Sequence, residues 1–212
     1  LGKCRLQDAE YTVMSDRIVA GTYLLAAAGT GGEIEILNVA EQHIHCLLHV
    51  CEAMGCQVRM TDRGIFLKSA RRLFAVEDIH TQPFPGFPTD MQSQLMAVLA
   101  TARGETTIYE HIFENRFRTA EELRKMGADI QIKNNRAVVR GAAKLKGCQV
   151  SARDLRGGAA LVIAGLMAEG DTIVENSIFV ERGYQDICKD LTQLDARIRH
   201  CRDAHKGRII GK

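Results

Sequence analysis

The chain has no tryptophan, only three prolines, and few aromatic residues, which make up 5% of its 212 residues. It lacks any apolar run of about 20 residues, the length a membrane helix needs, and any signal-peptide pattern. Its formal net charge of +2 is too small to indicate a nucleic-acid or membrane-surface partner, which calls for a clustered basic patch. We therefore expect a cytoplasmic protein that binds neither nucleic acid nor a membrane.

The seven cysteines lack the pattern of a disulfide framework or a structural metal site. Their number is odd, they are scattered, and none belongs to a Cys-x-x-Cys pair, which suits reduced thiols. His45 and His49 share one face of a helix predicted over residues 41–54, but no HExxH motif accompanies them. Ordinary surface and core positions are favoured for this His/Cys-rich helix, so we expect no metal and no cofactor.

The residues that are present indicate a globular domain or one lobe of a larger enzyme. Hydrophobic residues make up 46% of the chain and charged residues 25%, which is enough for a real core. The chain begins at Leu1 rather than at Met, which favours a fragment.

One unit is repeated three times along the chain. Each copy has an apolar helix, a glycine turn, a short strand, a second helix and an alternating strand. The turn glycine and the end of the second helix are separated by 23, 23 and 25 residues, in the pairs Gly32–Gly55, Gly104–Gly127 and Gly170–Asp195. We expect units of about 70 residues at about 12–78, 84–150 and 151–212, in an α/β lobe with approximate three-fold symmetry whose apolar helices pack together inside the sheets.

The start of each apolar helix carries an aspartate, namely Asp16, Asp90 or Asp154. By the assumed symmetry, the three helix N-termini fall at one end of the lobe, where their N–H groups and positive dipole ends favour anions. Behind Pro88, Thr89 and Gln92 have the spacing of a capping box. The sequence thus predicts a phosphate site at this end.

Four segments hold candidate site residues, each with a plainer alternative. The proline-rich segment 83–88 delivers Asp90 to a helix start, where simple capping is the alternative. The loop that contains Ile112 and Arg116 reads equally well as solvated surface. Arg156, before two glycines, has the geometry to grip a carboxylate or phosphate, or else forms an exposed ion pair. Arg182, beside a glycine in the fourth segment, is a weak signal by itself.

In order and spacing, these segments resemble the UDP-N-acetylglucosamine enolpyruvyl transferase family. The similarity covers about residues 10 to 200 and includes the runs 16–18, 87–92, 112–117, 154–156 and 182–184. The family has two lobes, each an inside-out α/β barrel of three repeated units, with the active site in the cleft between them. The resemblance implies that residues 1–212 form the C-terminal lobe and that the N-terminal lobe, with its catalytic Cys, is absent.

The resemblance also implies a reaction and a set of site residues. The family transfers the enolpyruvyl group of phosphoenolpyruvate to the 3-hydroxyl of UDP-N-acetylglucosamine and releases phosphate, the first committed step of peptidoglycan synthesis. Asp90 corresponds to the carboxylate that takes the sugar proton, and the Ile112 backbone to a nucleotide-sugar contact. The remaining expected cleft residues are Arg116, Asp154, Arg156 and Arg182, the last meeting the phosphoenolpyruvate anion.

Several departures from the family pattern limit what is expected of this chain. The acid Cys and the phosphate-binding Lys and Arg belong to the missing lobe, so the chain alone is expected to be inactive. The first strand of the family's chain also pairs in this lobe, so its loss would leave an unpaired edge. The residues Val19, Arg118, Thr119 and Asp195 also differ from the family pattern. These differences concern details of substrate contact and the end of the last helix, not membership of the family. Two alternatives stay open: a shikimate-type enolpyruvyl transferase lobe, and a non-catalytic half-lobe that binds a nucleotide or a partner.

Overall fold

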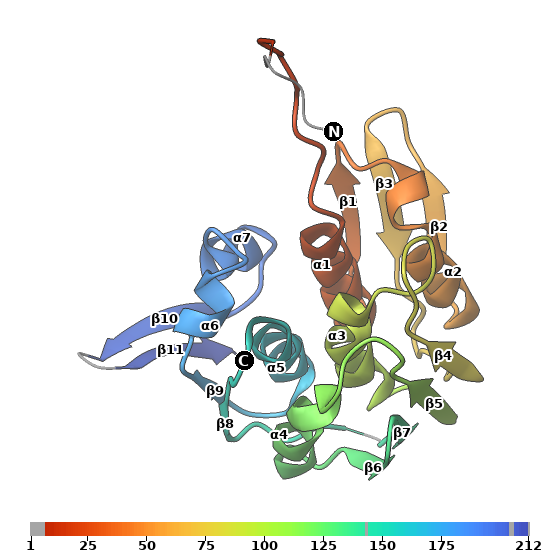
Figure 1. The fold of residues 1–212 in the computed structure, drawn as a ribbon. Helices are drawn as coiled ribbons and strands as arrows, with labels where there is room; N and C mark the ends of the chain where they lie inside the picture. Colours follow the sequence, from red (N-terminus) through yellow and green to blue (C-terminus); the bar gives the residue numbers. More distant parts are fainter. Residues whose placement is uncertain (1–6, 143, 204–205, 212) are drawn as a thin grey trace.

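Three apolar helices lie side by side at the centre of the molecule. The computed structural model describes residues 7–142, 144–203 and 206–211. Figure 1 shows α1 (Arg17–Thr30), α3 (Thr89–Leu99) and α5 (Leu155–Met167) packed together, with the sheets arranged around them. These are the three apolar segments of the sequence repeat, and the predicted α/β fold with its helices inside the sheets is confirmed.

The central helices run in the same direction. Gly21, near the start of α1, lies so close to the start of α3 that an added Cβ would come 2.7 Å from Met91 Sδ. Gly29, near the end of α1, faces the last turns of the other two helices, because its Cβ would meet Met167 and Val98. All three N-termini therefore lie at one end of the molecule, as the sequence predicts.

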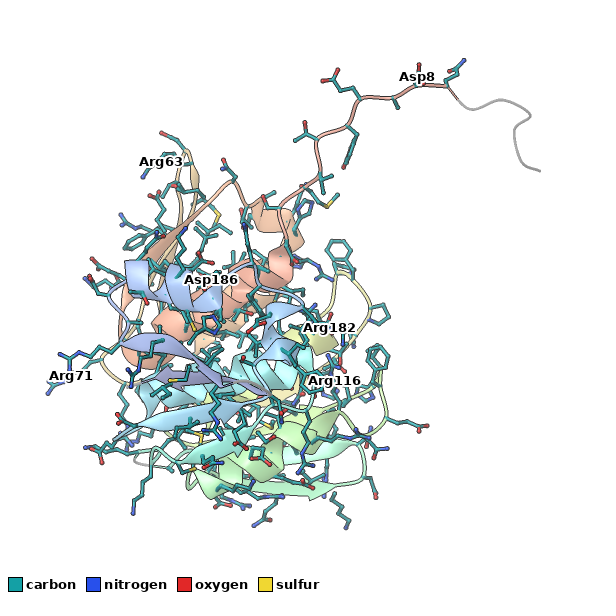
Figure 2. All side chains as sticks on the ribbon, turned by 90° about the vertical axis from the view of Figure 1, so that its left-hand side faces the viewer. Asp8, Arg63, Arg71, Arg116, Arg182 and Asp186 are labelled. Carbon is teal, nitrogen blue, oxygen red and sulfur yellow. The ribbon has the colours of Figure 1, made fainter. Side chains whose placement is uncertain are left out.

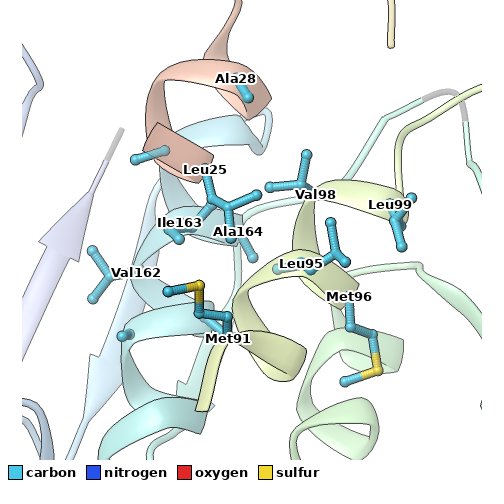
Figure 3. Packing of buried hydrophobic residues seen from close by; sticks show 14 of the residues in the cluster. Leu25, Ala28, Met91, Leu95, Met96, Val98, Leu99, Val162, Ile163 and Ala164 are labelled. Carbon is cyan, nitrogen blue, oxygen red and sulfur yellow. The ribbon is translucent and has the colours of Figure 1, made fainter. Parts of the chain in front are cut away.

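The core lies between these helices and extends outward to the sheets. Leu25, Met91, Leu95 and Ile163 are almost completely buried at the helix contacts (Figure 3). Complete burial of a side chain of this size contributes about 1.5–3 kcal/mol relative to exposure. The helices are apolar on nearly every face because each is covered by two neighbours and by a sheet.

Two of the three sheets have the same topology. The second sheet has the order β4-β5-β7-β6 and the third β8-β9-β11-β10; in each, the first pair is parallel and the others are antiparallel. The strands of the second sheet are β4 (Asp78–His80), β5 (Glu105–Tyr109), β6 (Asp129–Lys133) and β7 (Arg136–Arg140). Those of the third are β8 (Gln149–Ser151), β9 (Thr172–Glu175), β10 (Ile198–Asp203) and β11 (Lys206–Gly211).

The first sheet has one strand fewer than the other two. Its order is β1-β3-β2, formed by β1 (Glu33–Leu37), β2 (Gln57–Met60) and β3 (Gly64–Lys68), with Ile36 opposite Ile65. Among the residues that the structure describes, no strand takes the place beside β1 that β4 takes beside β5 and β8 beside β9. The outer edge of β1 is therefore open here, in agreement with the unpaired edge expected from the sequence.

Short helices cover the outer parts of the units. They are α2 (His45–Ala53), α4 (Thr119–Lys125), α6 (Ile178–Glu181) and α7 (Ile187–Gln193), with single 3-10 turns at Glu41–His43 and Arg116–Arg118. The predicted helix ends at Gly55 and Gly127 have positive φ angles of 99° and 94°. Asp195 takes the equivalent position with φ 64°, which an aspartate tolerates better than most residues. The departure from glycine therefore leaves the turn intact.

One prediction about particular residues differs from the structure. The capping box at the start of α3 is wrong: Pro88 is the N-cap residue, and the Thr89 hydroxyl donates to the Glu110 carboxylate at 2.9 Å. A strong charged acceptor has drawn the hydroxyl away from the helix end. At the end of the first predicted unit, Asp78 begins β4, which pairs with β5 of the second sheet.

Candidate active site

Two of the three central helices begin behind a capping aspartate. Asp16 Oδ1 accepts hydrogen bonds from the N–H groups of Ile18 at 2.8 Å and Val19 at 3.2 Å. Asp154 Oδ1 accepts from the N–H of Gly157 at 2.7 Å. Each carboxylate satisfies N–H groups that have no partner inside the helix. Asp154 thus fixes the start of α5, directly beside Arg156.

Asp90 lies in the first turn of α3 and joins two arginines. Its Oδ1 accepts from Arg116 Nη2 at 2.6 Å, and its Oδ2 accepts from Arg156 Nη2 at 3.1 Å. The Asp90 side chain is 38% exposed, whereas those of Arg116 and Arg156 are 20% and 17% exposed. The site therefore presents a carboxylate to solvent on a base of two largely buried cations, whose charge-assisted bonds fix its orientation.

Two arginines at this end of the molecule pack on aromatic rings of neighbouring loops. The Arg116 guanidinium lies 5.5 Å from the ring centre of Phe113, and that of Arg17 lies 5.4 Å from the ring centre of Phe84. Asn115, with φ 54°, turns the chain so that Arg116 points back toward α3. Arg116 Nε and Arg17 Nη1 are buried without a hydrogen-bond partner in the described part of the chain. The site therefore has cationic donors that its carboxylate does not satisfy.

Glu110 holds the loop after β5 against the start of α3. Sequence reasoning did not identify it as a candidate site residue. Its side chain is buried, with the residue 3% exposed. The carboxylate accepts four hydrogen bonds, from Thr81 Oγ1 at 2.8 Å, Thr89 Oγ1 at 2.9 Å, and the N–H groups of Ile112 at 2.8 Å and Phe113 at 3.1 Å. The one available signal was an acidic residue directly after an alternating strand.

The six predicted site residues take different places around this centre. Asp90, Arg116 and Arg156 are in direct contact, and Asp154 caps the helix that carries Arg156. Ile112 lies in the loop fixed by Glu110, and with Arg116 it lines an open cavity of about 990 Å³.

Arg182 stands apart from the ion-paired centre. It is exposed in the turn between α6 and α7, on the side of the molecule where Arg116 also lies (Figure 2). Arg182 is therefore placed to meet a ligand without breaking the ion pairs of Asp90.

Burial raises the pKa of five described thiols, those of Cys46, Cys51, Cys56, Cys148 and Cys188. Burial raises the pKa of Cys188 to about 12 and raises that of Cys51 further above its ordinary range. Such thiols remain protonated at neutral pH and are poor nucleophiles. Within residues 7–142, 144–203 and 206–211, no group of three or more His, Cys, Asp or Glu side chains is placed to hold a metal ion, and no helix is long and apolar enough to cross a membrane.

Residues 1–191 match the protein family described as EPSP synthase (3-phosphoshikimate 1-carboxyvinyltransferase). The chain is 46% identical over 197 residues to UDP-N-acetylglucosamine 1-carboxyvinyltransferase 2 of Caldanaerobacter subterraneus, covering 93% of this chain and 47% of that protein. It is also 46% identical over 198 residues to UDP-N-acetylglucosamine 1-carboxyvinyltransferase of Desulfofundulus thermocisternus, covering 93% of this chain and 79% of that sequence. Apart from this second relative, the chain spans about half the length of the curated relatives compared.

Solved structures show the same fold. The enolpyruvyl transferase NikO from Streptomyces tendae aligns with a TM-score of 0.71 and 26% identity, covering 87% of this chain and 44% of that one. EPSP synthase from Acinetobacter baumannii aligns with a TM-score of 0.65 and 18% identity, covering 95% and 46% of the two chains.

Proposed function

The chain belongs to the EPSP synthase family, and from this premise we propose that it forms the C-terminal lobe of a UDP-N-acetylglucosamine 1-carboxyvinyltransferase. Residues 1–212 would be one lobe of three repeat units, and the other lobe, with the catalytic Cys, lies outside this sequence. The ion-paired centre of Asp90, Arg116 and Arg156 at the helix N-termini is the observation that carries the proposal. The identity of 44–46% to relatives of that name supports it.

In the proposed reaction, the 3-hydroxyl oxygen of UDP-N-acetylglucosamine adds to the enol carbon of phosphoenolpyruvate, while the methylene carbon takes a proton from the acid of the missing lobe. Phosphate then leaves this tetrahedral intermediate as the new methyl group loses a proton, which restores the double bond, and the product enters peptidoglycan synthesis. Asp90 accepts the hydroxyl proton, since its carboxylate is at the exposed edge of the site and is oriented by two guanidinium groups. Substrate and carboxylate would meet where the missing lobe closes over this surface.

The loop after β5 would bind the nucleotide sugar. The Ile112 N–H already donates to Glu110, whereas its carbonyl accepts no hydrogen bond from the described residues, so this carbonyl would be the backbone group that meets a ligand. Glu110 therefore has a positioning role, because it fixes the backbone that presents this carbonyl.

The cationic groups would bind phosphoenolpyruvate and the departing phosphate. Arg116 and Arg156 are already in place, Arg182 is exposed and would approach on closure, and Asp154 holds the start of α5. The three helix N-termini add positive dipole ends at the same position. Preorganised donors of this kind stabilise charge that develops in a transition state.

A shikimate-type transferase lobe is the second candidate, and the family description favours it. The higher identity to the sugar-nucleotide enzymes favours the first candidate. A non-catalytic half-lobe is the third, and it differs from both in lacking turnover under any condition.

The chain alone is expected to release no phosphate from phosphoenolpyruvate and UDP-N-acetylglucosamine, because half of the active site is absent. We define the hybrid enzyme as the Caldanaerobacter relative in which the matching residues are replaced by those of this chain. The hybrid enzyme is expected to release phosphate only when both substrates are present, as measured by a colorimetric phosphate assay.

Shikimate 3-phosphate in place of the sugar nucleotide is the control acceptor. Phosphate release with that acceptor alone would favour the second candidate, and a folded hybrid enzyme without turnover would favour the third. Turnover by the 212-residue chain itself would refute the half-site account.

A further inference from the structure

Three buried polar side chains lie beneath the Asp90 centre, one from each repeat unit. Thr22 on α1, Gln94 on α3 and Tyr184 between α6 and α7 are 2%, 0% and 3% exposed. The Tyr184 hydroxyl lies 2.8 Å from Thr22 Oγ1, and Gln94 Nε2 lies 3.4 Å from the same oxygen. Burying a polar group without a hydrogen-bond partner is costly, so these bonds tie the positions of the three side chains to one another.

The direction of the hydrogen bonds follows from the number of available protons. Thr22 has one hydroxyl proton, and Oγ1 donates it to the Ile18 carbonyl at 2.9 Å. Thr22 therefore accepts from Tyr184, whose phenol is the donor. The oxygen of Tyr184 keeps its lone pairs for other donors, and the side chains of Gln94 and Arg156 are its further hydrogen-bond partners.

Arg156 lies between Tyr184 and Asp90. Burial raises the pKa of Tyr184, and the nearby positive charge of Arg156, also a hydrogen-bond partner, lowers it only in part. The phenol therefore stays protonated at neutral pH and remains a donor to Thr22. On its other side, Arg156 Nη2 donates to Asp90 Oδ2 at 3.1 Å. Bonds arranged head to tail in this way strengthen one another.

We propose that Tyr184 is a positioning residue whose hydroxyl fixes the Arg156 guanidinium against Asp90. It links the geometry of the site to the packing of the three repeat units, because Thr22 and Gln94 fix the hydroxyl in turn. The consequence for catalysis rests on the function proposed above.

The same residue also restrains the turn that carries Arg182. The Tyr184 side chain is buried two positions after exposed Arg182, and Gly183 packs so closely on α5 that an added Cβ would come 2.7 Å from Leu155 Cδ1. The base of the turn is therefore fixed on the first residue of α5, next to Arg156. Tyr184 thus sets the position of one cation and the attachment of another.

Tyr23 offers a matched control. Its hydroxyl donates to Asp190 Oδ2 at 2.7 Å and, like that of Tyr184, connects α1 with the third unit. In the described structure, the hydrogen bonds of Tyr23 and Asp190 include none to Asp90 or Arg156. Tyr23→Phe removes a comparable bond without touching the proposed link.

Arginine side-chain NMR of the 212-residue chain tests the positioning role. In the wild type and in Tyr23→Phe, rotation of the Arg156 guanidinium about its Cζ–Nη bonds is expected to be slow. In Tyr184→Phe it is expected to be about 10-fold faster, as for loss of one hydrogen bond to a charged group. Thr22→Val removes the acceptor of the phenol proton and is also expected to make the rotation of the Arg156 guanidinium faster. This variant replaces Tyr184→Phe in the test if Tyr184→Phe fails to fold. Unchanged Arg156 rotation in a folded variant would overturn the proposal.

Kinetics of the hybrid enzyme test the consequence. Tyr184→Phe is expected to lower kcat about 10-fold with KM for UDP-N-acetylglucosamine within about 3-fold, because misplaced catalytic groups affect the transition state more than ground-state binding. Tyr23→Phe is expected to retain both constants. Wild-type kcat in Tyr184→Phe would contradict the inference, whereas an inactive unmutated hybrid would count against the proposed function and leave the NMR result to decide this one.

Discussion

Replacing Asp90 by Asn in the hybrid enzyme is expected to lower kcat for phosphate release about 10²–10⁴-fold, the range for loss of a general base. The amide has nearly the shape of the carboxylate but does not take a proton from the sugar hydroxyl. It also removes the charge that Arg116 and Arg156 bind, so both guanidinium groups lose a charged acceptor. Steady-state phosphate release at saturating substrates measures the effect.

Glu105→Gln is the control for loss of a carboxylate that pairs with an arginine. Glu105 Oε2 lies 2.6 Å from Arg140 Nε on the sheet, and both side chains are substantially exposed. Exposed pairs contribute little, so this variant is expected to keep the activity of the unmutated hybrid. A loss smaller than about 5-fold in Asp90→Asn would contradict the base role, because removal of a general base has a larger effect.

Glu110→Gln is expected to lower the free energy of unfolding of the chain by about 3 kcal/mol, the upper range for disrupting a buried charged hydrogen-bond network. The carboxylate accepts from two threonine hydroxyls and two backbone N–H groups. An amide in this place keeps its oxygen on Thr81, Ile112 and Phe113, but its NH₂ group replaces the acceptor of the Thr89 hydroxyl, and the charge that strengthens all four bonds is lost. Urea unfolding, followed by circular dichroism, measures this change in the free energy of unfolding, provided that the dependence on urea concentration has the same slope in both proteins.

Glu121→Gln provides the comparison for this stability measurement. Glu121 pairs with Arg153 at 2.9 Å, but its side chain is 55% exposed. The change is expected to stay within about 0.5 kcal/mol, as for most surface substitutions. Equal small effects in the two variants would show that the Glu110 network does not hold the loop after β5.

The repeat allowed much of the fold to be predicted from the sequence. The apolar helix, the turn glycine and the helix end recur at nearly constant spacing, and each of these signals is local. The convergence of the helix N-termini followed from symmetry alone. Asp195 stands where the other two copies have a glycine at the end of the second helix. The turn is kept there because an aspartate also adopts its positive φ angle.

The contacts of the site were less accessible to sequence reasoning. Asp90 meets Arg116 and Arg156 across 26 and 66 residues, separations that no local pattern encodes. The predicted capping box failed for the same reason, because the acceptor of Thr89 is Glu110, 21 residues away. The family resemblance indicated which residues to consider, and the three-dimensional arrangement identified the partners of each.

A symmetric scaffold here carries an asymmetric site. The capping positions of the three helices have diverged: Asp16 and Asp154 cap α1 and α5, whereas Pro88 takes this position in α3, and Asp90, two residues further on, binds two arginines. The contacts of Asp90 with the second and third units make the site depend on how the units pack.

Titration of the ¹⁵N-labelled chain with UDP-N-acetylglucosamine tests the central claim, that this end of the lobe is half of a substrate site. The account predicts weak binding, in the millimolar range expected for an incomplete site, with amide shifts concentrated at Asp90, Ile112, Phe113 and Arg116. Shikimate 3-phosphate at the same concentrations is expected to leave the Ile112 and Phe113 amides unshifted. Shifts confined to the opposite side of the lobe, or none up to about 10 mM ligand, would contradict the account.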